Sequence, residues 1–222
     1  MDNCLQCEPG LQHPGPARLP LQGSAEQGTS RAMRVVAGTL GGQHLYAPKG
    51  SSVRPTPDRV REALFSALGD LSGAEVLDLY AGTGAISFEA ISRGARTATL
   101  VEKDRQALAT IARNIEHLRL SKNQAKVIAS EVNGALARLV RGPDRFDLIF
   151  ADPPYQEAAV LLPKVLEAGL TILAEGGIIV LEHGKRDQPP AAPEGLSLER
   201  SRGYGETMLA FYRRPAAEGP TA

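Results

Sequence analysis

Between residues 76 and 181 the sequence alternates short apolar runs with amphipathic segments, and this alternation constrains the fold more than any other feature. The predicted strands are Val76–Tyr80, Ala98–Glu102, Lys126–Ala129, Phe146–Ala151 and Gly177–Leu181. The predicted helices lie at about Gly84–Arg93, from Asp104 through Leu118, through Leu136 and Val140, and near Glu157–Ala168. Strands that alternate with helices at this spacing predict a parallel sheet with helices on both faces.

A different pattern follows Gly184. A proline-rich loop extends to Gly195 and leads into two strand-like runs, Leu196–Arg202 and Glu206–Arg213, which are separated by Gly203-Tyr204-Gly205. A glycine-rich turn between two such runs indicates a β-hairpin. The sequence therefore predicts an α/β fold whose mostly parallel seven-stranded sheet is closed by a C-terminal antiparallel hairpin.

The segment before the alternation predicts a β-hairpin and then a helix. Val35–Gly38 and His44–Ala47 flank a turn at Gly41-Gly42. Thr56 is a suitable N-cap, Pro57 a suitable first helical residue, and Asp58 a favourable first-turn charge. An apolar stripe predicts a helix over residues 57–68, with Arg59, Glu62 and Ser66 facing away from the core; the stripe is Val60, Ala63, Leu64, Ala67 and Leu68.

These elements divide the 222-residue chain into four parts. Residues 1–32 lack hydrophobic periodicity and are rich in glycine and proline, which predicts a disordered leader. Residues 33–70 are the N-terminal hairpin and helix, residues 71–214 the α/β domain, and residues 215–222 a loose tail. The only cysteines, Cys4 and Cys7, lie in the leader, and one C-x-x-C pair is weak evidence for zinc or redox chemistry. We expect no metal site.

Charge and hydropathy narrow the class of protein. The formal net charge is zero, so a surface that binds nucleic acid must be local. Residues 31–62 contain six Lys or Arg and two Asp or Glu, a net charge of +4 that favours an anionic partner. The sequence has no signal-peptide pattern and no uninterrupted run of about 18 apolar residues, which predicts a cytoplasmic protein without a membrane partner.

The loop after the first predicted strand has the form of a nucleotide-cofactor loop. Gly82 and Gly84 allow a tight turn and close approach of a ligand, and the next helix presents free N–H groups to that ligand. Twenty residues after Gly82, Glu102 ends the second strand, where a carboxylate can bind both hydroxyls of a ribose. Glu131 follows the third strand and is placed to reach an adenine ring.

Asp78 indicates the type of cofactor. The segment Gly82–Ser87 is one residue away from the G-x-G-x-x-G pattern of dinucleotide enzymes, because Ser87 replaces the third glycine. A fixed carboxylate at Asp78 is unfavourable beside a pyrophosphate but suits a cationic ligand. S-adenosylmethionine carries an ammonium and a sulfonium group and no phosphate, so we expect it as the cofactor. Asp78 could also cap the amides of its own loop.

The fourth predicted strand ends in Asp152-Pro153-Pro154-Tyr155. The Asp152 carboxylate and the Pro153 carbonyl can accept hydrogen bonds from an exocyclic amino group, and Tyr155 can stack on its base. Holding the nitrogen lone pair in line with a methyl donor accelerates transfer by positioning. We therefore predict that Asp152, Pro153 and Tyr155 are catalytic. In the alternative interpretation the strand ends in a rigid turn and Tyr155 belongs to the core.

These motifs resemble those of amino-directed class I methyltransferases that carry a (D/N)PP(Y/F) motif. The segments Arg34–Gly38, Arg54–Phe65, Asp78–Ala85 and Phe88–Ala95 are similar to the 16S ribosomal RNA guanine-N2 methyltransferase family (RsmD type), and the similarity extends from Arg34 to about Arg213. The resemblance implies a Rossmann-like sheet and methylation of the 2-amino group of one guanine in small-subunit rRNA, within a ribosomal subunit or an assembly intermediate.

The resemblance also implies roles for individual residues. Gly82, Gly84 and Glu102 would bind S-adenosylmethionine, and Asp152, Pro153 and Tyr155 would hold the guanine. The hairpin and Arg54, Arg59 and Arg61 would contact RNA or order the lid of the site. The positive charge of the same region predicts that Arg34 and Lys49 also bind RNA. We expect the protein to be a monomer.

Three other functions are compatible with these residues. A DNA adenine or cytosine amino methyltransferase would share the tetrapeptide, although the absence of a separate target-recognition domain mildly favours folded RNA. A non-catalytic RNA-binding module would keep the fold, but the intact Asp152 and Tyr155 argue against it. A nicotinamide oxidoreductase would share the glycine-rich loop, and cofactor titration would distinguish it.

Overall fold

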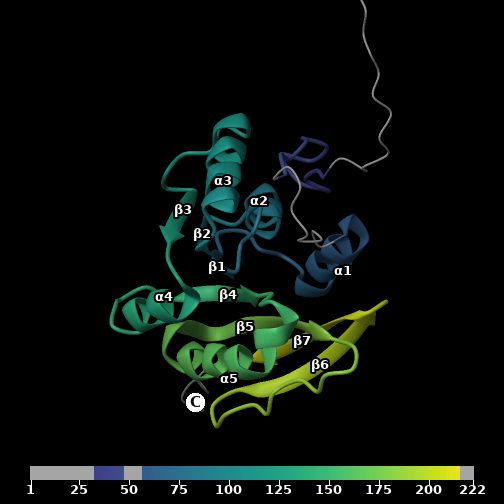
Figure 1. The fold of residues 1–222 in the computed structure, drawn as a ribbon, viewed down its shortest axis with the longest axis vertical. Coiled ribbons are helices and arrows are strands. Elements are labelled where there is room, and N and C mark those ends of the chain that lie inside the picture. Colours follow the sequence, from purple (N-terminus) through teal and green to yellow (C-terminus); the bar gives the residue numbers. More distant parts are fainter. Residues whose placement is uncertain (1–32, 48–56, 216–222) are drawn as a thin grey trace, which may run out of the picture. The chain divides into compact units, whose positions relative to one another are not determined.

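A computed structural model describes residues 33–47 and 57–215 of the chain. These residues form one seven-stranded sheet and the helices around it (Figure 1). The strands are β1 (Glu75–Leu79), β2 (Thr97–Glu102), β3 (Ala125–Ala129), β4 (Phe146–Ala151), β5 (Leu173–Gly184), β6 (Ser197–Tyr204) and β7 (Thr207–Arg213). The helices are α1 (Asp58–Leu68), α2 (Ala85–Ser92), α3 (Arg105–His117), α4 (Val132–Leu139) and α5 (Tyr155–Ile172).

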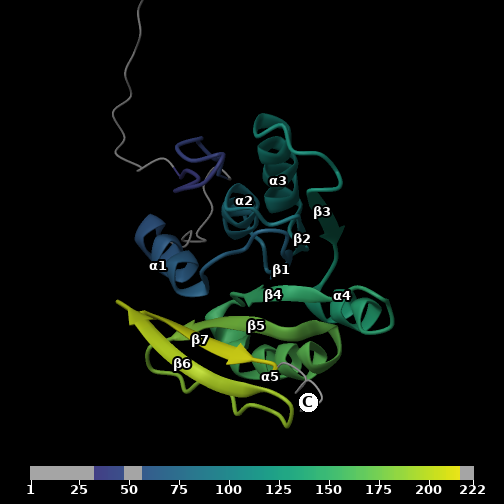
Figure 2. The same ribbon diagram turned by 180° about the vertical axis from the view of Figure 1, so that it is seen from behind.

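The strand order is β3-β2-β1-β4-β5-β7-β6, and β1 to β5 are parallel. The last strand, β7, is antiparallel to both of its neighbours, β5 and β6. Helices α1, α2 and α3 pack on one face of the sheet, and α4 and α5 pack on the other (Figures 1 and 2). Each face of the sheet has one hydrophobic core beneath its helices. The predicted sheet, parallel except for a C-terminal antiparallel hairpin, is confirmed.

The order of the strands fixes where a ligand would bind. From β1 the chain continues outward through β2 and β3, and it then returns to the other side of β1 to form β4. The central strands β1 and β4 are hydrogen-bonded neighbours, with Leu79 beside Ala151. In open α/β sheets ligands bind outside the carboxyl ends of the strands at such a reversal of strand order. The loops that follow Leu79 and Ala151 are the ones at that point.

Several boundaries differ from the sequence prediction. Residues 34–47 do not form extended strands, and a single antiparallel bridge joins Arg34 to His44. Strand β5 begins at Leu173, four residues before the predicted start, because it bends through a register shift opposite β4. The C-terminal hairpin turns at residues 205–206, so Gly203 and Tyr204 are part of β6. Pro57 is the N-cap of α1 and not its first helical residue, and Thr56 lies outside the described residues.

Two side chains of α2 hold the N-terminal segment in place. The buried Glu89 carboxylate accepts hydrogen bonds from the N–H groups of Val36 (2.6 Å) and Ala37 (3.1 Å). Ser92 accepts from the N–H of Leu40 at 2.9 Å and donates its hydroxyl to the Ala37 carbonyl. Backbone groups of an irregular segment need such partners once they leave water. The segment therefore belongs to the same compact unit as the sheet.

Asn114 of α3 connects the N-terminal segment to the loop after β1. Its fully buried amide accepts from the Tyr46 N–H at 2.7 Å and donates to the carbonyls of Tyr46 and Thr83, both at 3.1 Å. The guanidinium of Arg113 lies 3.5 Å from the centre of the Tyr46 ring. One side chain thus orders both the Tyr46 backbone and the glycine-rich loop. No helix in the described part of the chain is long and apolar enough to cross a membrane.

Candidate functional site

The glycine-rich loop and the end of β2 meet directly. The Glu102 carboxylate accepts hydrogen bonds from the N–H of Gly82 at 2.8 Å and from the N–H groups of Lys103 and Asp104 at 2.8 and 2.9 Å. The structure thereby brings together two predicted cofactor residues that lie twenty positions apart. A carboxylate oriented by three backbone donors is a preformed acceptor for ligand hydroxyl groups.

The two glycines of the loop have different roles. Both have positive φ angles, 56° at Gly82 and 80° at Gly84. A Cβ atom on Gly82 would approach nothing closer than the Tyr80 carbonyl oxygen at 4.0 Å, whereas one on Gly84 would lie 2.5 Å from Cε2 of Phe88. Gly82 therefore borders open space beside the loop. Gly84 is required because a side chain there would clash with Phe88 of the core. Its missing side chain therefore makes room for Phe88 and not for a ligand.

Asp78 is buried and bonds to the first turn of α2. The Ser87 hydroxyl donates to its carboxylate at 2.7 Å. Burial raises the pKa of Asp78 to about 7, against the hydrogen bonds from Ser87, and repulsion from Asp152 and Glu102 adds to the rise. Asp78 thus bonds to Ser87 in the first turn of α2, and the capping of the amides of its own loop stays a prediction. Ser87 stands where the dinucleotide pattern has its third glycine, and its hydroxyl group is the donor to Asp78.

A hollow of about 60 Å³ lies where β1 to β4 end. It is lined by Tyr80, Lys103, Glu131, Val132, Asn133, Pro154, Glu157 and Leu161. Glu131 is exposed and pairs with the Lys103 ammonium at 3.2 Å. Tyr80 adopts a positive φ of 66°, and its buried hydroxyl has no hydrogen-bond partner among the described residues. An unpaired buried hydroxyl is costly, so this atom is suited to bind a ligand in the hollow.

The tetrapeptide joins β4 to α5. Pro153 is buried, Pro154 is the N-cap of α5, and Tyr155 is the first residue of that helix. The Tyr155 side chain is 58% exposed, which contradicts the alternative interpretation that it belongs to the core. Asp152 follows Ala151, which pairs with Leu79, so it lies beside the loop after β1. The predicted catalytic and cofactor residues therefore meet at the central pair of strands.

One site residue, Glu182, is missing from the sequence prediction. It lies in β5 and is buried, and its carboxyl group interacts with that of Asp152. Burial raises the pKa of both groups, and mutual repulsion adds to the rise at Glu182. Together with Asp78, these residues place three carboxyl groups at the carboxyl end of the sheet. Such a site favours a cationic ligand, which would relieve the repulsion.

The predicted RNA-binding residues differ in accessibility. Arg34 is about half exposed and pairs with Asp58 at 3.3 Å, and Arg59 is exposed on α1. Arg61 is 1% exposed and donates to the Arg34 carbonyl and to Asp58, so the prediction that it contacts RNA is corrected: it positions the N-terminal segment. Lys49 and Arg54 lie outside the described residues.

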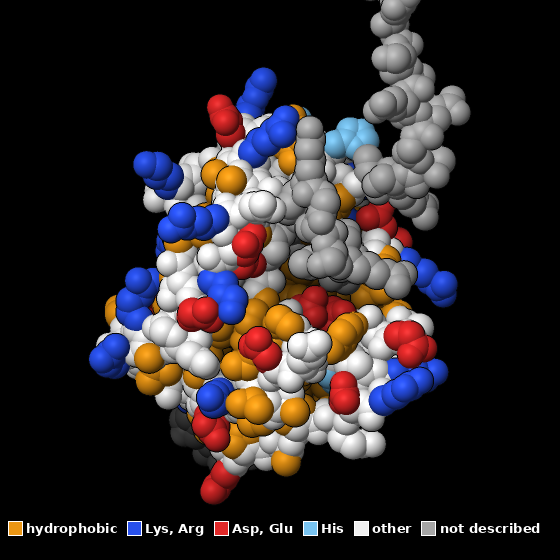
Figure 3. Space-filling view, in the orientation of Figure 1, with side chains coloured by type: hydrophobic (Ala, Val, Ile, Leu, Met, Phe, Trp, Pro, Cys, Tyr) orange, Lys and Arg blue, Asp and Glu red, His pale blue; other side chains and the backbone are white. Residues whose placement is uncertain are grey.

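On the face shown in Figure 3, Lys and Arg side chains lie mostly toward the rim, and hydrophobic and acidic side chains gather near the middle. On this face the basic side chains are therefore spread around the rim and are not gathered in one patch.

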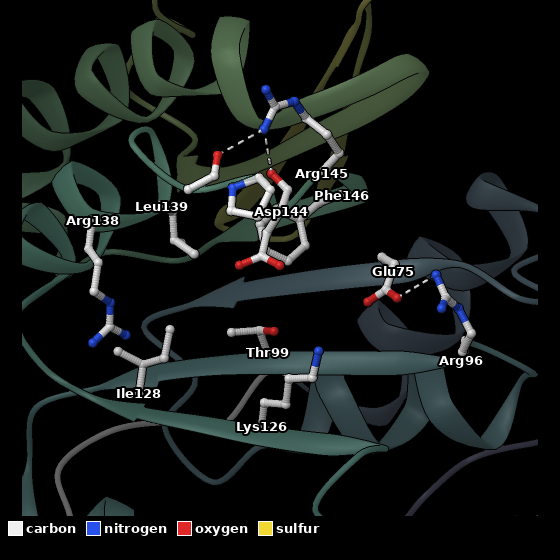
Figure 4. A pocket seen from close by; sticks show the side chains of 12 residues that line it. Glu75, Arg96, Thr99, Lys126, Ile128, Arg138, Leu139, Asp144, Arg145 and Phe146 are labelled. Carbon is white, nitrogen blue, oxygen red and sulfur yellow. Dashed lines mark hydrogen bonds and ion pairs between the residues drawn. The ribbon is translucent and has the colours of Figure 1, made fainter.

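A second hollow, of about 500 Å³, lies at the opposite end of the strands (Figure 4). Glu75 begins β1 and Phe146 begins β4, and both line it, so it contains none of the predicted site residues. Its basic groups are partly engaged, since Arg96 pairs with Glu75 at 2.6 Å and Arg145 donates to the carbonyls of Gly142 and Asp144. The described residues contain no group of three His, Cys, Asp or Glu side chains suited to a metal ion.

Comparisons with known proteins identify relatives. The model of the family described as "Conserved hypothetical protein 95" matches residues 33–213. "Putative rRNA methyltransferase YlbH" of Bacillus subtilis (strain 168) is 36% identical over 183 residues, covering 82% of this chain and 99% of that protein. "Ribosomal RNA small subunit methyltransferase D" of Escherichia coli (strain K12) is 31% identical over 194 residues, covering 84% and 92%. The solved structure of "Putative methyltransferase yhhF" from Escherichia coli aligns with a TM-score of 0.72 and 31% identity, covering 83% and 99%.

Proposed function

Since the chain belongs to the conserved hypothetical protein 95 family, the RsmD-type methyltransferases, we propose that it transfers a methyl group from S-adenosylmethionine to small-subunit rRNA. We propose further that the acceptor is the exocyclic 2-amino group of one guanine. The relatives named as rRNA methyltransferases support the reaction and the class of substrate. The choice of guanine rests on the tetrapeptide and on the resemblance of the N-terminal motifs.

The observation that carries the proposal is the meeting of two loops at the central strands. Leu79 and Ala151 are hydrogen-bonded neighbours, so the glycine-rich loop after β1 and the tetrapeptide after β4 lie side by side. A cofactor at Gly82 and a base at Tyr155 would then face each other across Asp152. This proximity is what group transfer requires, because it places donor and acceptor in one orientation.

The residues present fit S-adenosylmethionine. Glu102 is already oriented toward the loop by three backbone N–H groups and would accept the ribose hydroxyls. The buried Asp78 and the half-buried Asp152 suit a cation, and the hollow with the Tyr80 hydroxyl, which is unpaired among the described residues, suits an adenine edge beside Glu131. When bound, the cofactor supplies an electrophilic methyl group on its sulfonium.

The protein residues would act on the acceptor nitrogen. The lone pair of a guanine amino group is delocalised into the ring, so the nitrogen is a poor nucleophile. Asp152 and the Pro153 carbonyl would accept its two N–H hydrogen bonds and orient the lone pair toward the methyl group. Tyr155 would stack on the base, which is accessible when a nucleotide in an RNA loop turns out of its stack. Asp152 would also stabilise the positive charge that develops on the nitrogen.

Mapping of modified nucleosides tests the proposal. Small-subunit rRNA from cells with and without the protein would be digested and analysed by mass spectrometry. We expect one N2-methylguanosine to be lost without the protein and restored by its expression. Purified protein should transfer the methyl group to unmodified rRNA, and naked RNA and assembled subunits should be compared as substrates. Loss of a methylated adenine or cytosine instead would contradict the guanine assignment.

Alanine substitutions at Gly82 and Gly84 are a matched pair that tests the cofactor loop. Both positions have positive φ, so each alanine carries a similar conformational cost of roughly 1–2 kcal/mol. Gly84→Ala also forces its Cβ against Phe88 and should lower the melting temperature further, since overpacking costs roughly 1–3 kcal/mol. Gly82→Ala places its Cβ in open space.

The readout for this pair is calorimetric titration with S-adenosylmethionine together with a thermal melt. We expect Gly82→Ala to remain folded and to lose roughly tenfold or more in affinity, because a clash with the ligand of about 1.4 kcal/mol has that effect. Unchanged affinity in the folded Gly82→Ala protein would show that the cofactor does not approach this loop.

Basic residues of the N-terminal region should govern RNA affinity. Phosphate contacts release counterions, so each one adds about 0.7–0.9 to the slope of log affinity against log salt. We expect Lys49→Gln with Arg59→Gln to weaken rRNA binding and reduce that slope by about 1–2, with little change in melting temperature. Arg61→Gln is the control, because Arg61 is buried: it should lower the melting temperature and leave the slope nearly unchanged. A double variant with the wild-type slope would make Lys49 and Arg59 ordinary solvated charges.

A further inference from the structure

Glu182 is a buried carboxyl group that the proposed mechanism leaves without a role. Its side chain is 5% exposed, and the Thr207 hydroxyl donates to Oε1 at 3.3 Å. The second oxygen, Oε2, is buried and has no hydrogen-bond partner among the described residues. Buried polar atoms in folded proteins are nearly always paired. An atom left unpaired beside a substrate site is suited to bind the substrate.

The sheet places Glu182 next to the residues that would hold the base. Strands β4 and β5 pair in parallel with Ala151 beside Leu181, so the next residues, Asp152 and Glu182, extend from the same face of the sheet. The Coulombic interaction between the two carboxyl groups agrees with this placement. Just beyond Glu182, a Cβ atom on Gly184 would lie 3.8 Å from the Tyr155 ring. The end of β5 therefore borders the base site.

The chemistry of this carboxyl group matches one edge of guanine. Burial and repulsion from Asp152 raise the pKa of Glu182, which favours its neutral form. A neutral carboxyl group presents an O–H donor and a carbonyl acceptor side by side. Guanine presents an O6 acceptor and an N1–H donor side by side, directly next to its 2-amino group. Adenine and cytosine do not present this pair next to their amino groups.

We propose that Glu182 reads the O6 and N1–H edge of the target guanine while Asp152 and Pro153 hold its 2-amino group. In this arrangement Oε2–H donates to O6, and Oε1, which has a second lone pair, accepts from N1–H. Glu182 is then the residue that selects guanine among the bases that carry an amino group. This inference rests on the proposed function, because it names the group that recognises its substrate.

The test compares two acceptors and three proteins. At the nucleotide located by mapping, the rRNA substrate carries either guanine or 2-aminopurine, which keeps the 2-amino group and lacks both O6 and N1–H. Wild type, Glu182→Gln and Glu182→Leu are measured for kcat/KM on each substrate. The preference for guanine is the ratio of the two values, and any intrinsic difference in reactivity cancels when this ratio is compared between proteins.

We expect the preference to fall by roughly 10- to 100-fold in Glu182→Leu, since a recognition group that leaves base atoms unpaired loses about that much. Glu182→Gln should keep the preference, because an amide also presents a donor beside an acceptor. The melting temperature of Glu182→Leu should be unchanged or higher, because a buried acid beside another acid is replaced by an apolar side chain of similar size.

A purely structural role for Glu182 would appear as an altered melting temperature with an unchanged preference, and that result would overturn the inference. An equal loss of preference in Glu182→Gln and Glu182→Leu would also overturn it, because the paired donor and acceptor would not be what matters. If the wild-type protein methylates guanine and Glu182→Leu retains the preference, only this inference fails. If the wild-type protein methylates neither substrate, the proposed function fails and this inference fails with it.

Discussion

Replacing Asp152 by alanine is expected to reduce single-turnover methylation of small-subunit rRNA by roughly 100-fold or more, in line with the cost of misplacing a reacting group. The variant loses the acceptor that orients the amino nitrogen and the negative charge that stabilises it during transfer. Asp152 is half-buried at a strand end, and the loop after β1 is bonded to Glu102 of β2. Cofactor binding and the melting temperature should therefore largely survive.

Asp152→Asn separates the two contributions of this residue. The amide oxygen can still accept one N–H hydrogen bond, so the loss of rate should be smaller than in the alanine variant. The pKa of Asp152 is raised by burial, so protonation removes the acceptor at a pH above the ordinary carboxyl range. The wild-type rate should fall as the pH decreases through that raised pKa, and the asparagine variant should lack this step. A folded alanine variant with a near-normal rate would remove the tetrapeptide from the mechanism.

Substitution of Tyr155 is expected to have the second large effect on the methylation rate. If its ring stacks on the target base, Tyr155→Ala should lose about 1–3 kcal/mol of binding, roughly 5- to 150-fold in single-turnover rate at limiting RNA. Tyr155→Phe keeps the ring and should be mild. Because the side chain is 58% exposed, neither change should alter the melting temperature much.

Val160 offers a control on the same helix, since it is 62% exposed and lies outside the tetrapeptide. Val160→Ala should leave the rate unchanged. The order wild type, then phenylalanine, then alanine indicates stacking. If phenylalanine were as damaging as alanine, the phenol group and not the ring face would be the functional part.

The alternation of elements could be predicted from sequence because periodicity reports burial directly. Strand β4 has the predicted bounds, β1 is shifted by one residue at both ends, and β2 begins one residue earlier than predicted. Asp104 is the predicted start of the third helix, and its side chain caps α3 by accepting from the N–H groups of Gln106 and Ala107. Strand β5 extends beyond its apolar run because its first residues pair with β4. The local sequence pattern does not show this pairing.

The placement of the candidate site residues can be predicted where residue type and position agree, and it cannot where they conflict. Arg61 is three residues before Leu64 and four before Phe65, so it lies on the buried side of α1. Its charge suggested a surface position, but tertiary contacts with Asp58 and the Arg34 carbonyl override that expectation. Glu182 follows an apolar run and looks like the polar end of a strand. The available signal was that a charged residue continues directly from Ile178–Leu181.

The roles of Ser87 and Asn114 could not be predicted, because their partners are distant in the sequence. Ser87 bonds to Asp78 nine residues away, and Asn114 bonds to Tyr46 and Thr83 at separations of 68 and 31 residues. Polar residues on amphipathic helices are usually solvated, so nothing in the local pattern distinguishes these. Only the packing of α2 and α3 against the sheet reveals them.

The position of β7 has a consequence for how the protein is made. This strand is the last of the described strands, yet it is inserted between β5 and β6, and Thr207 within it supplies a hydrogen bond to Glu182. While the chain emerges from the ribosome, β5 keeps an unpaired edge until β7 has been synthesised, and exposed strand edges promote aggregation. A premature stop before residue 207 would remove an interior strand rather than trim an end. The sheet and the surroundings of its acidic site therefore cannot be completed before residues 207–213 have been synthesised.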